Sequence, residues 1–130
     1  MTKTALIIED EIFVALDLER ILTEAGYQVA AIAADSAQAL AAAPGCTFAL
    51  VDVNLRDGAT GPDIAERIAR DHGVKVVFVT ANPAQITGCT DALGYVRKPF
   101  NDKAILAAAA LATGDPVAAN DDIVRLDALG

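Results

Sequence analysis

Short apolar runs alternate along this chain with longer segments that have the spacing of helices. The first run, Ala5-Leu6-Ile7-Ile8, is continuously apolar and ends at Glu9-Asp10, as expected for a strand buried on both faces. The apolar residues that follow recur on one face of a helix: Val14, Leu18, Ile21, Leu22 and Ala25. Gly26 predicts the end of this helix, because glycine readily takes the left-handed backbone of a C′ position.

The same alternation continues to residue 112. Further strands are expected over residues 27–32, 48–51, 74–79 and 95–96, and further helices over 36–43, 62–71 and 101–112. A short, weak helix is expected over 83–87, because Pro83 suits a first helical position and Gly88 follows soon after. Five strand–helix units in strict alternation predict a doubly wound α/β fold, with helices on both faces of a five-stranded parallel sheet.

Polar residues follow the strands of this predicted sheet. They are Glu9, Asp10, Asp52, Thr80 and Lys98. Each alone has an ordinary explanation, such as a helix cap, a loop hydroxyl or a solvated charge. In a doubly wound sheet, however, ligands bind beyond the carboxyl ends of the strands. Three carboxylates meeting there repel one another, and one lysine offsets only one charge. The set therefore predicts a site for a hard divalent cation such as Mg²⁺, which prefers oxygen ligands.

Charge and composition narrow the function classes. The chain has 130 residues, a formal net charge of −8 and a pI near 4.4. This balance argues against a nucleic-acid partner, which would need clustered Lys and Arg. No apolar run approaches the roughly 18 residues of a membrane span, and the start of the chain shows no signal-peptide pattern, so a cytoplasmic protein is expected. Cys46 and Cys89 form no CxxC motif and are expected to be unpaired, half-buried thiols.

The strand-end residues resemble those of a known protein family. Glu9-Asp10, Asp52, Thr80 and Lys98-Pro99-Phe100 resemble, in type and in spacing, the receiver domains of two-component response regulators. The resemblance covers about residues 4–112. It implies a flavodoxin-like (βα)5 fold with strand order 2-1-3-4-5 and a receiver domain at 1–112. Residues 113–130 are then a short tail without an output domain, with a possible helical turn around Ile123, Leu126 and Leu129.

The resemblance also implies a role for each site residue. Asp52 would be the phosphoacceptor. Mg²⁺ would be held by Asp10, Asp52 and the backbone carbonyl of Asn54, with Glu9 acting through a metal-bound water. Thr80 and Lys98 would contact the phosphoryl oxygens. Asn54 and Asn82 would set the phosphoryl lifetime, Thr80 and Tyr95 would form the switch, and the Lys98–Pro99 bond would be cis.

The implied function is that of a stand-alone response regulator rather than an enzyme. A histidine kinase or a histidine phosphotransferase would supply the phosphoryl group, and slow self-dephosphorylation would remove it. Phosphorylation would then change the face formed by the fourth helix, the fifth strand and the fifth helix. The signal would pass by protein contact, with an unidentified downstream protein or a second copy as the partner, or the domain would serve as a relay or phosphate sink.

Three other functions remain open from the residues alone. A Mg²⁺-dependent phosphatase with an aspartate nucleophile would need a second Asp at the position of Asn54. A flavodoxin-like nucleotide binder would place phosphate beside Glu9-Asp10-Glu11, which would repel it. A protein-interaction module that does not use phosphorylation is the third.

Overall fold

A computed structural model describes residues 3–86, 91–115 and 123–125. Its central sheet has six strands in the order β2-β1-β3-β4-β5-β6. The strands are β1 (Thr4–Ile8), β2 (Gln28–Ala33), β3 (Phe48–Val51), β4 (Lys75–Thr80), β5 (Ala92–Arg97) and β6 (Ile123–Arg125). The first five are parallel and follow the order 2-1-3-4-5, so the expected flavodoxin-like fold is confirmed.

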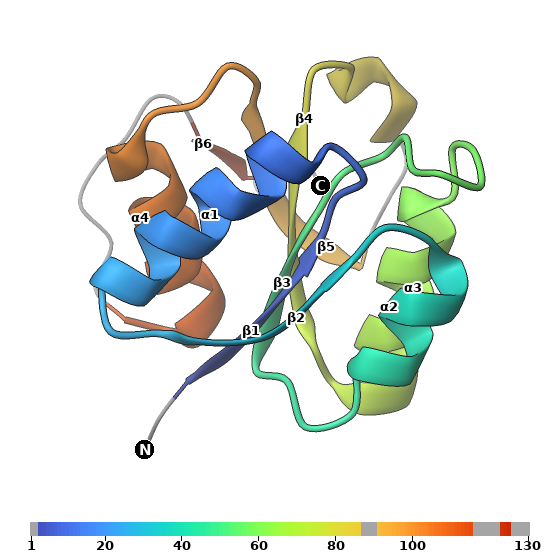
Figure 1. Ribbon diagram of the computed structural model, residues 1–130, viewed down its shortest axis with the longest axis horizontal. Coiled ribbons are helices and arrows are strands. Elements are labelled where there is room, and N and C mark those ends of the chain that lie inside the picture. The colour runs from blue at the N-terminus through green and yellow to red at the C-terminus, as the bar shows by residue number, and fades with distance from the viewer. Residues whose placement is uncertain (1–2, 87–90, 116–122, 126–130) are drawn as a thin grey trace.

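Helices cover both faces of this sheet (Figure 1). They are α1 (Ile12–Glu24), α2 (Ser36–Ala42), α3 (Gly61–His72) and α4 (Asp102–Thr113), with the 3₁₀ helix η1 (Pro83–Ile86) in the fourth connection. On one face α1 and α4 bury a core that includes Leu22, Phe48 and Ile105. On the other, α2, α3 and η1 bury a second core that includes Ile64 and Phe78. None of the described helices has the length and apolar character needed to cross a membrane.

Helix ends follow local chemistry. The Asp35 side chain accepts a hydrogen bond from Gln38 N at 2.9 Å and caps α2, while Asn101 Oδ1 accepts from Ala104 N at 2.8 Å and caps α4. Gly26 has φ +95° directly after the last turn of α1, as its predicted role in ending the helix requires.

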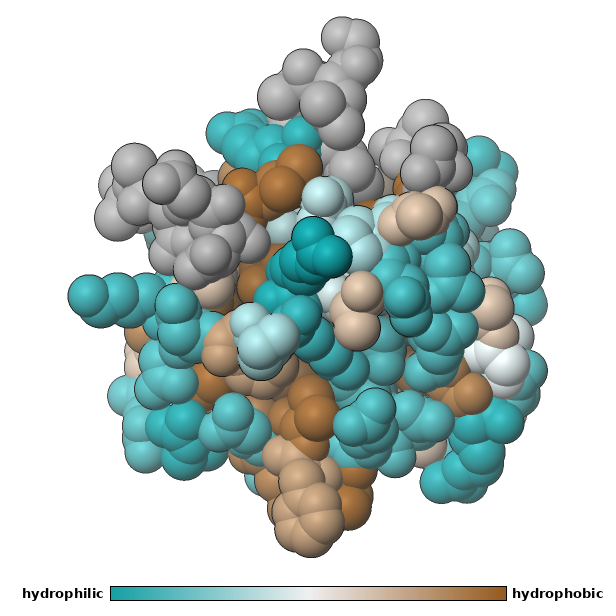
Figure 2. Space-filling model, turned by 90° about the horizontal axis from the view of Figure 1, so that it is seen from above, coloured by the Kyte–Doolittle hydropathy of each residue, from teal (hydrophilic) through white to brown (hydrophobic). Residues whose placement is uncertain are grey.

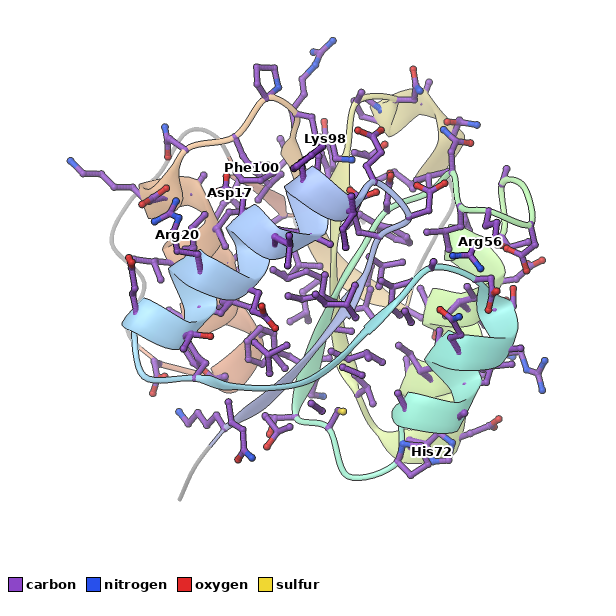
Figure 3. The ribbon with its side chains drawn as sticks, in the orientation of Figure 1. Asp17, Arg20, Arg56, His72, Lys98 and Phe100 are labelled. Carbon is purple, nitrogen blue, oxygen red and sulfur yellow. The ribbon has the colours of Figure 1, made fainter. Side chains whose placement is uncertain are left out.

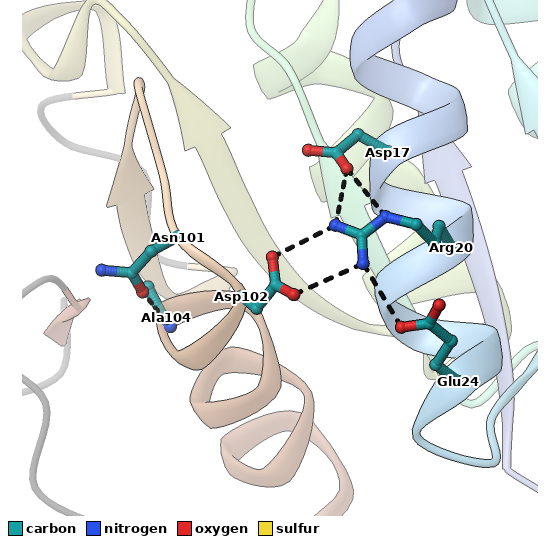
Figure 4. Close-up of polar contacts among 6 residues, drawn as sticks. All are labelled: Asp17, Arg20, Glu24, Asn101, Asp102 and Ala104. Atoms are coloured by element: carbon teal, nitrogen blue, oxygen red, sulfur yellow. Dashed lines mark hydrogen bonds and ion pairs between the residues drawn. The ribbon is translucent and has the colours of Figure 1, made fainter.

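A cluster of charges joins α1 to α4 across their exposed sides (Figure 4). The guanidinium of Arg20 contacts Asp17 at 2.8 Å and Glu24 at 3.3 Å, both on α1, and Asp102 on α4 at 3.2 Å. The hydrogen bonds that Arg20 donates to Asp102 and Asp17 raise its pKa further above its already high value. All four side chains are exposed, so salt screens the cluster and its stabilising effect is small.

The structure differs from the sequence expectation at three elements. The fourth connection holds a 3₁₀ turn in place of an α-helix, and Thr87 lies outside the described residues. Strand β5 begins at Ala92 rather than Tyr95, because its first half lies beside β4. The helical turn expected around Ile123 is wrong: residues 123–125 form β6, which pairs antiparallel with β5. Leu126 and Leu129 lie outside the described residues, as does Cys89, whereas Cys46 is buried and unpaired.

Candidate functional site

The carboxyl ends of β1, β3, β4 and β5 bring the polar strand-end residues to one rim of the sheet. Asp52 follows β3 and is 7% exposed, Glu9 follows β1 and is 2% exposed, and Thr80 ends β4 fully buried. Asp10 lies at the same rim and is exposed. Figure 2 looks onto this rim and shows hydrophilic residues gathered at its centre. Residues that are far apart in the chain therefore share one partly buried polar site.

Lys98 connects the two buried carboxylates. Its Nζ lies 2.5 Å from Glu9 Oε1 and 3.1 Å from Asp52 Oδ2. The other oxygen of Asp52, Oδ1, accepts a hydrogen bond from Val53 N at 2.8 Å. Both oxygens of Asp52 are thus held in place by neighbouring donors. The peptide bond from Lys98 to Pro99 is cis.

The site is strongly electrostatic. Burial raises the pKa of Glu9 to about 7, and the hydrogen bond from Lys98 opposes this rise. For Lys98, burial acts against the charged form, but the hydrogen bonds and charges of Glu9 and Asp52 outweigh it and raise the pKa. Two buried carboxylates and one ammonium leave an excess of negative charge in a region of low dielectric, which favours binding of a cation or neutralisation of Glu9.

Three carboxylates are close enough to hold one metal ion. One oxygen each from Glu9, Asp10 and Asp52 can be chosen so that all lie within 4.8 Å of one another. Mg²⁺–oxygen distances of about 2.1 Å put two ligands of one ion at most about 4.2 Å apart. The three carboxylate oxygens therefore need to move only slightly closer together to bind the same ion. The donors are all oxygens, as Mg²⁺ requires. The residues present therefore fit this ion.

Thr80 and the asparagines lie around this centre. Thr80 Oγ1 accepts a hydrogen bond from Asn82 N at 2.9 Å, which leaves its own proton available for donation. The side chains of Asn54 and Gln85 exchange two hydrogen bonds, of 3.0 Å and 3.3 Å. This amide pair joins the loop after β3 to η1. Tyr95 is half-buried on β5 and packs against the core on the α2–α3 face.

Two contributors to the site were not anticipated from the sequence. One is Gln85, the partner of Asn54. The other is Gly61, the first residue of α3, where an added Cβ would lie 2.1 Å from the carbonyl oxygen of Asp52. Gly61 N also donates to Val53 O at 3.0 Å. The Gly-Pro pair indicates the start of a helix, but no sequence signal places it against the backbone of Asp52.

Beside the polar centre lies an apolar surface on α1. Its large hydrophobic side chains Ile12, Phe13 and Leu16 are 56%, 85% and 45% exposed. A pocket of about 490 Å³ adjoins them and is lined by Phe13, Val14, Asp17, Ala81, Lys98, Pro99 and Phe100. Figure 3 shows Lys98 and Phe100 next to the start of α1, whereas His72, the single histidine of the chain, lies at the opposite end of the sheet. The site therefore has no imidazole to act as a general base.

Comparison with known proteins agrees with this geometry. The family model described as "Response regulator receiver domain" matches residues 5–110. The chain belongs to the response regulator receiver domain family. A curated relative, the phyllosphere-induced regulator PhyR of Methylorubrum extorquens, is 34% identical over 107 residues, which cover 77% of this chain and 39% of the relative. The receiver thus spans about two fifths of that protein's length.

The structure of this chain is also similar to solved receiver structures over most of its length. The solution structure of the PhyR receiver domain of Erythrobacter litoralis has a TM-score of 0.80 and 30% identity, and covers 91% of this chain and 97% of that one. A response regulator from Burkholderia pseudomallei, with a phosphorylated aspartic acid, a calcium ion and citrate, has a TM-score of 0.71 and 27% identity. That match covers 82% of this receiver and 65% of that chain.

Proposed function

We propose that this receiver acts in the cytoplasm as a response regulator and takes a phosphoryl group onto Asp52. The observation that carries the proposal is the setting of Asp52 at the end of β3. Its carboxylate is nearly buried, one oxygen is held by Val53 N at 2.8 Å, and the other lies 3.1 Å from Lys98 Nζ. A fixed carboxylate beside a cation suits attack on phosphorus, because the nucleophile is already held in position.

The proposed donor is the phosphohistidine of a histidine kinase or a histidine phosphotransferase. An oxygen of Asp52 attacks the phosphorus, the phosphorus–nitrogen bond breaks, and the electron pair leaves with the imidazole, which takes up a proton. Lys98 and the hydroxyl of Thr80 would donate hydrogen bonds to the phosphoryl oxygens, where negative charge accumulates in the transition state. Because no imidazole lies at the rim to activate water, attack of water on the product should be slow, and a lasting phosphoprotein is the expected result.

Mg²⁺ is the proposed cofactor, held by Asp10, Asp52 and the backbone carbonyl of Asn54, with Glu9 acting through a bound water. When bound, the ion supplies positive charge that offsets the charge of the transferring group. The fit of the oxygen donor set and the excess negative charge of the site support this assignment. Asn54 and Asn82, at the mouth of the site, are proposed to set the phosphoryl lifetime.

The apolar surface of α1 supports a protein as the donor. Ile12, Phe13 and Leu16 project beside the rim, and a helix face of this kind suits burial against another helix. The signal is proposed to leave through Thr80, which ends β4, and Tyr95, which lies within the neighbouring strand β5. Turning of Tyr95 would then alter the face made by η1, β5 and α4, read by a downstream protein or a second copy.

Labelling with a small acyl phosphate and Mg²⁺, followed by intact-mass measurement, tests the proposal. Wild type should gain the mass of one phosphoryl group, Asp52→Asn should gain none, and peptide mapping should place the modification on Asp52. Asp71→Asn, at the far end of α3, is the matched control and should label as wild type does. Labelling of Asp52→Asn to the wild-type extent would refute the assignment.

A further inference from the structure

The strand β6 covers the edge of β5 that would otherwise end the sheet. Ile123, Val124 and Arg125 pair antiparallel with Val96, Tyr95 and Gly94. An uncovered sheet edge pairs readily with strands of other proteins, and natural proteins commonly cover such edges. The chain therefore shields its own β5 with a segment from the end of the sequence.

The pairing uses both faces of β6. Residues directly opposite in an antiparallel pair lie on the same face of the sheet. Ile123 faces Val96 and packs against the core under α1 and α4. Val124 faces Tyr95, which packs against the core of the other face. The edge of β5 thus accommodates β-branched apolar residues at two successive positions of the added strand, and each of these residues lies on a different face of the sheet.

Gly94 makes the close approach of β6 possible. A Cβ at this position would lie 2.4 Å from the carbonyl oxygen of Val124 and 3.2 Å from the Cα of Arg125. All three of the nearest atoms belong to β6, so glycine serves this contact rather than the packing of β4. The edge of β5 is therefore shaped to receive a strand at this place.

The contact that holds β6 is short. Of the residues that the structure describes, three form β6, against six in β5, and an isolated pair of such length has little stability of its own. Its persistence depends on covalent attachment, which gives a tethered segment an effective concentration in the millimolar range. A partner segment that matches β5 over five or six residues gains more backbone pairing and more side-chain burial than β6 has.

We propose that the edge of β5 is a strand-addition site that β6 fills within the same molecule. The partner is an extended segment of another protein, which runs antiparallel to β5 and places β-branched apolar residues opposite Val96 and Tyr95. It binds by replacing β6, so β6 sets a threshold of affinity that the partner must exceed. This inference does not depend on phosphorylation of Asp52.

Binding of a fluorescent peptide with the sequence of residues 121–127 tests the proposal, using the full chain and two matched variants. Val124→Asp weakens β6 without changing β5 and should bind the peptide about tenfold more tightly than wild type, because the competitor within the chain is lost. Gly94→Ala also releases β6 and leaves no room for a strand placed as β6 is, so it should not bind this peptide. Amide exchange in β5 should be fast in both variants, and the peptide should slow it only in Val124→Asp.

Several results would overturn the proposal. One is that wild type and Val124→Asp bind the peptide equally weakly, although fast amide exchange in β5 of the variant shows that β6 has been released. Another is binding by Gly94→Ala. A third is a wild-type dimer, seen by light scattering, that Gly94→Ala makes monomeric, with no peptide bound by Val124→Asp whose circular dichroism shows it to be folded. In that case β6 is exchanged between copies instead. Val124→Gly, a milder change, gives the same reading if Val124→Asp does not fold.

Discussion

The Nζ of Lys98 lies closer to Glu9, at 2.5 Å, than to Asp52, at 3.1 Å. The lysine therefore neutralises the more deeply buried of two neighbouring carboxylates. A phosphoryl group on Asp52 would have to draw this ammonium away from Glu9. The charge state of Glu9 and the position of Lys98 are accordingly linked, and this linkage gives the first two predictions.

Glu9 should make stability depend on pH. Its pKa is about 7 when folded, against an ordinary value of 4.5, so between these values the folded state binds more protons than the unfolded state. Stability is then greatest below pH 4.5 as far as Glu9 is concerned, and falls as pH rises to 7. The loss should be on the order of 1–3 kcal/mol. Denaturant unfolding of wild type and Glu9→Gln across this pH range measures the free energy of unfolding. In the variant it should not fall with pH in this way, and Mg²⁺ should reduce the fall in wild type.

Lys98→Met should be less stable than wild type by about 1–3 kcal/mol at pH 8, because removal of the lysine leaves Glu9 and Asp52 buried without a counter-charge. At pH 5.5 protonated Glu9 relieves the repulsion, so the difference should shrink. Urea unfolding at both pH values measures it. Lys103→Met, on the exposed side of α4, is the control and should have little effect at either pH. A loss that does not change with pH would contradict this account.

Gly61→Ala should displace Asp52 through contact with its backbone. The added Cβ would lie 2.1 Å from Asp52 O and 2.7 Å from Val53 Cα, so the strand end or α3 must move. We expect a loss of about 1–3 kcal/mol and slower labelling of Asp52. Gly73→Ala has nothing within 4 Å of its Cβ but has φ +67°. It should cost about 1 kcal/mol through backbone strain alone and leave the labelling rate unchanged.

The amide pair of Asn54 and Gln85 should control access to the site. Its loss in Gln85→Ala frees η1 from the loop after β3, and we expect the lifetime of phosphorylated Asp52 to change by about twofold to tenfold, the range of one or two exposed hydrogen bonds. A double-mutant cycle with Asn54→Ala separates this from a direct effect of Asn54. The two changes should be non-additive; strict additivity would show that the pair does not act as a unit.

Weakening of β6 should favour the phosphorylated form. Val124 faces Tyr95, so if phosphorylation turns Tyr95 it must also change the surroundings of β6. If the turn of Tyr95 removes its contact with Val124 and so weakens β6, then by reciprocity loss of β6 favours the turn. Val124→Asp should raise the steady-state labelling of Asp52 by about twofold or more at limiting acyl phosphate, measured by intact mass. Unchanged labelling would show that β6 and the phosphorylation site are independent, and would leave the strand-addition site untouched.

The sequence predicts most of the fold because continuous apolar runs identify the buried strands. Phe48–Val51 and residues 76–79 are such runs, and the polar residues that follow them, Asp52 and Thr80, locate the rim. It fails at β5, where Gly94 interrupts the pattern, and at β6, where three residues are too few for a period to appear. In a segment that short, pairing with a neighbour decides the structure rather than local preference.

The site follows the same rule. Residues with distinctive chemistry at strand ends, such as Asp52 and Lys98, could be found from type and spacing. Gln85 and Gly61 could not, since their importance comes from one amide contact and one close backbone approach. Both depend on how a loop and a helix settle against the rim, which is a property of the packed molecule.

The remote position of His72 has a practical consequence. As the single imidazole in the sequence, at the end of the molecule opposite Lys98 (Figure 3), it gives ring-proton resonances that can be assigned without isotope labelling. These signals should stay constant while groups near Asp52 respond to acyl phosphate or Mg²⁺. The protein thus carries its own internal standard, against which every spectral change at the rim can be calibrated in one sample.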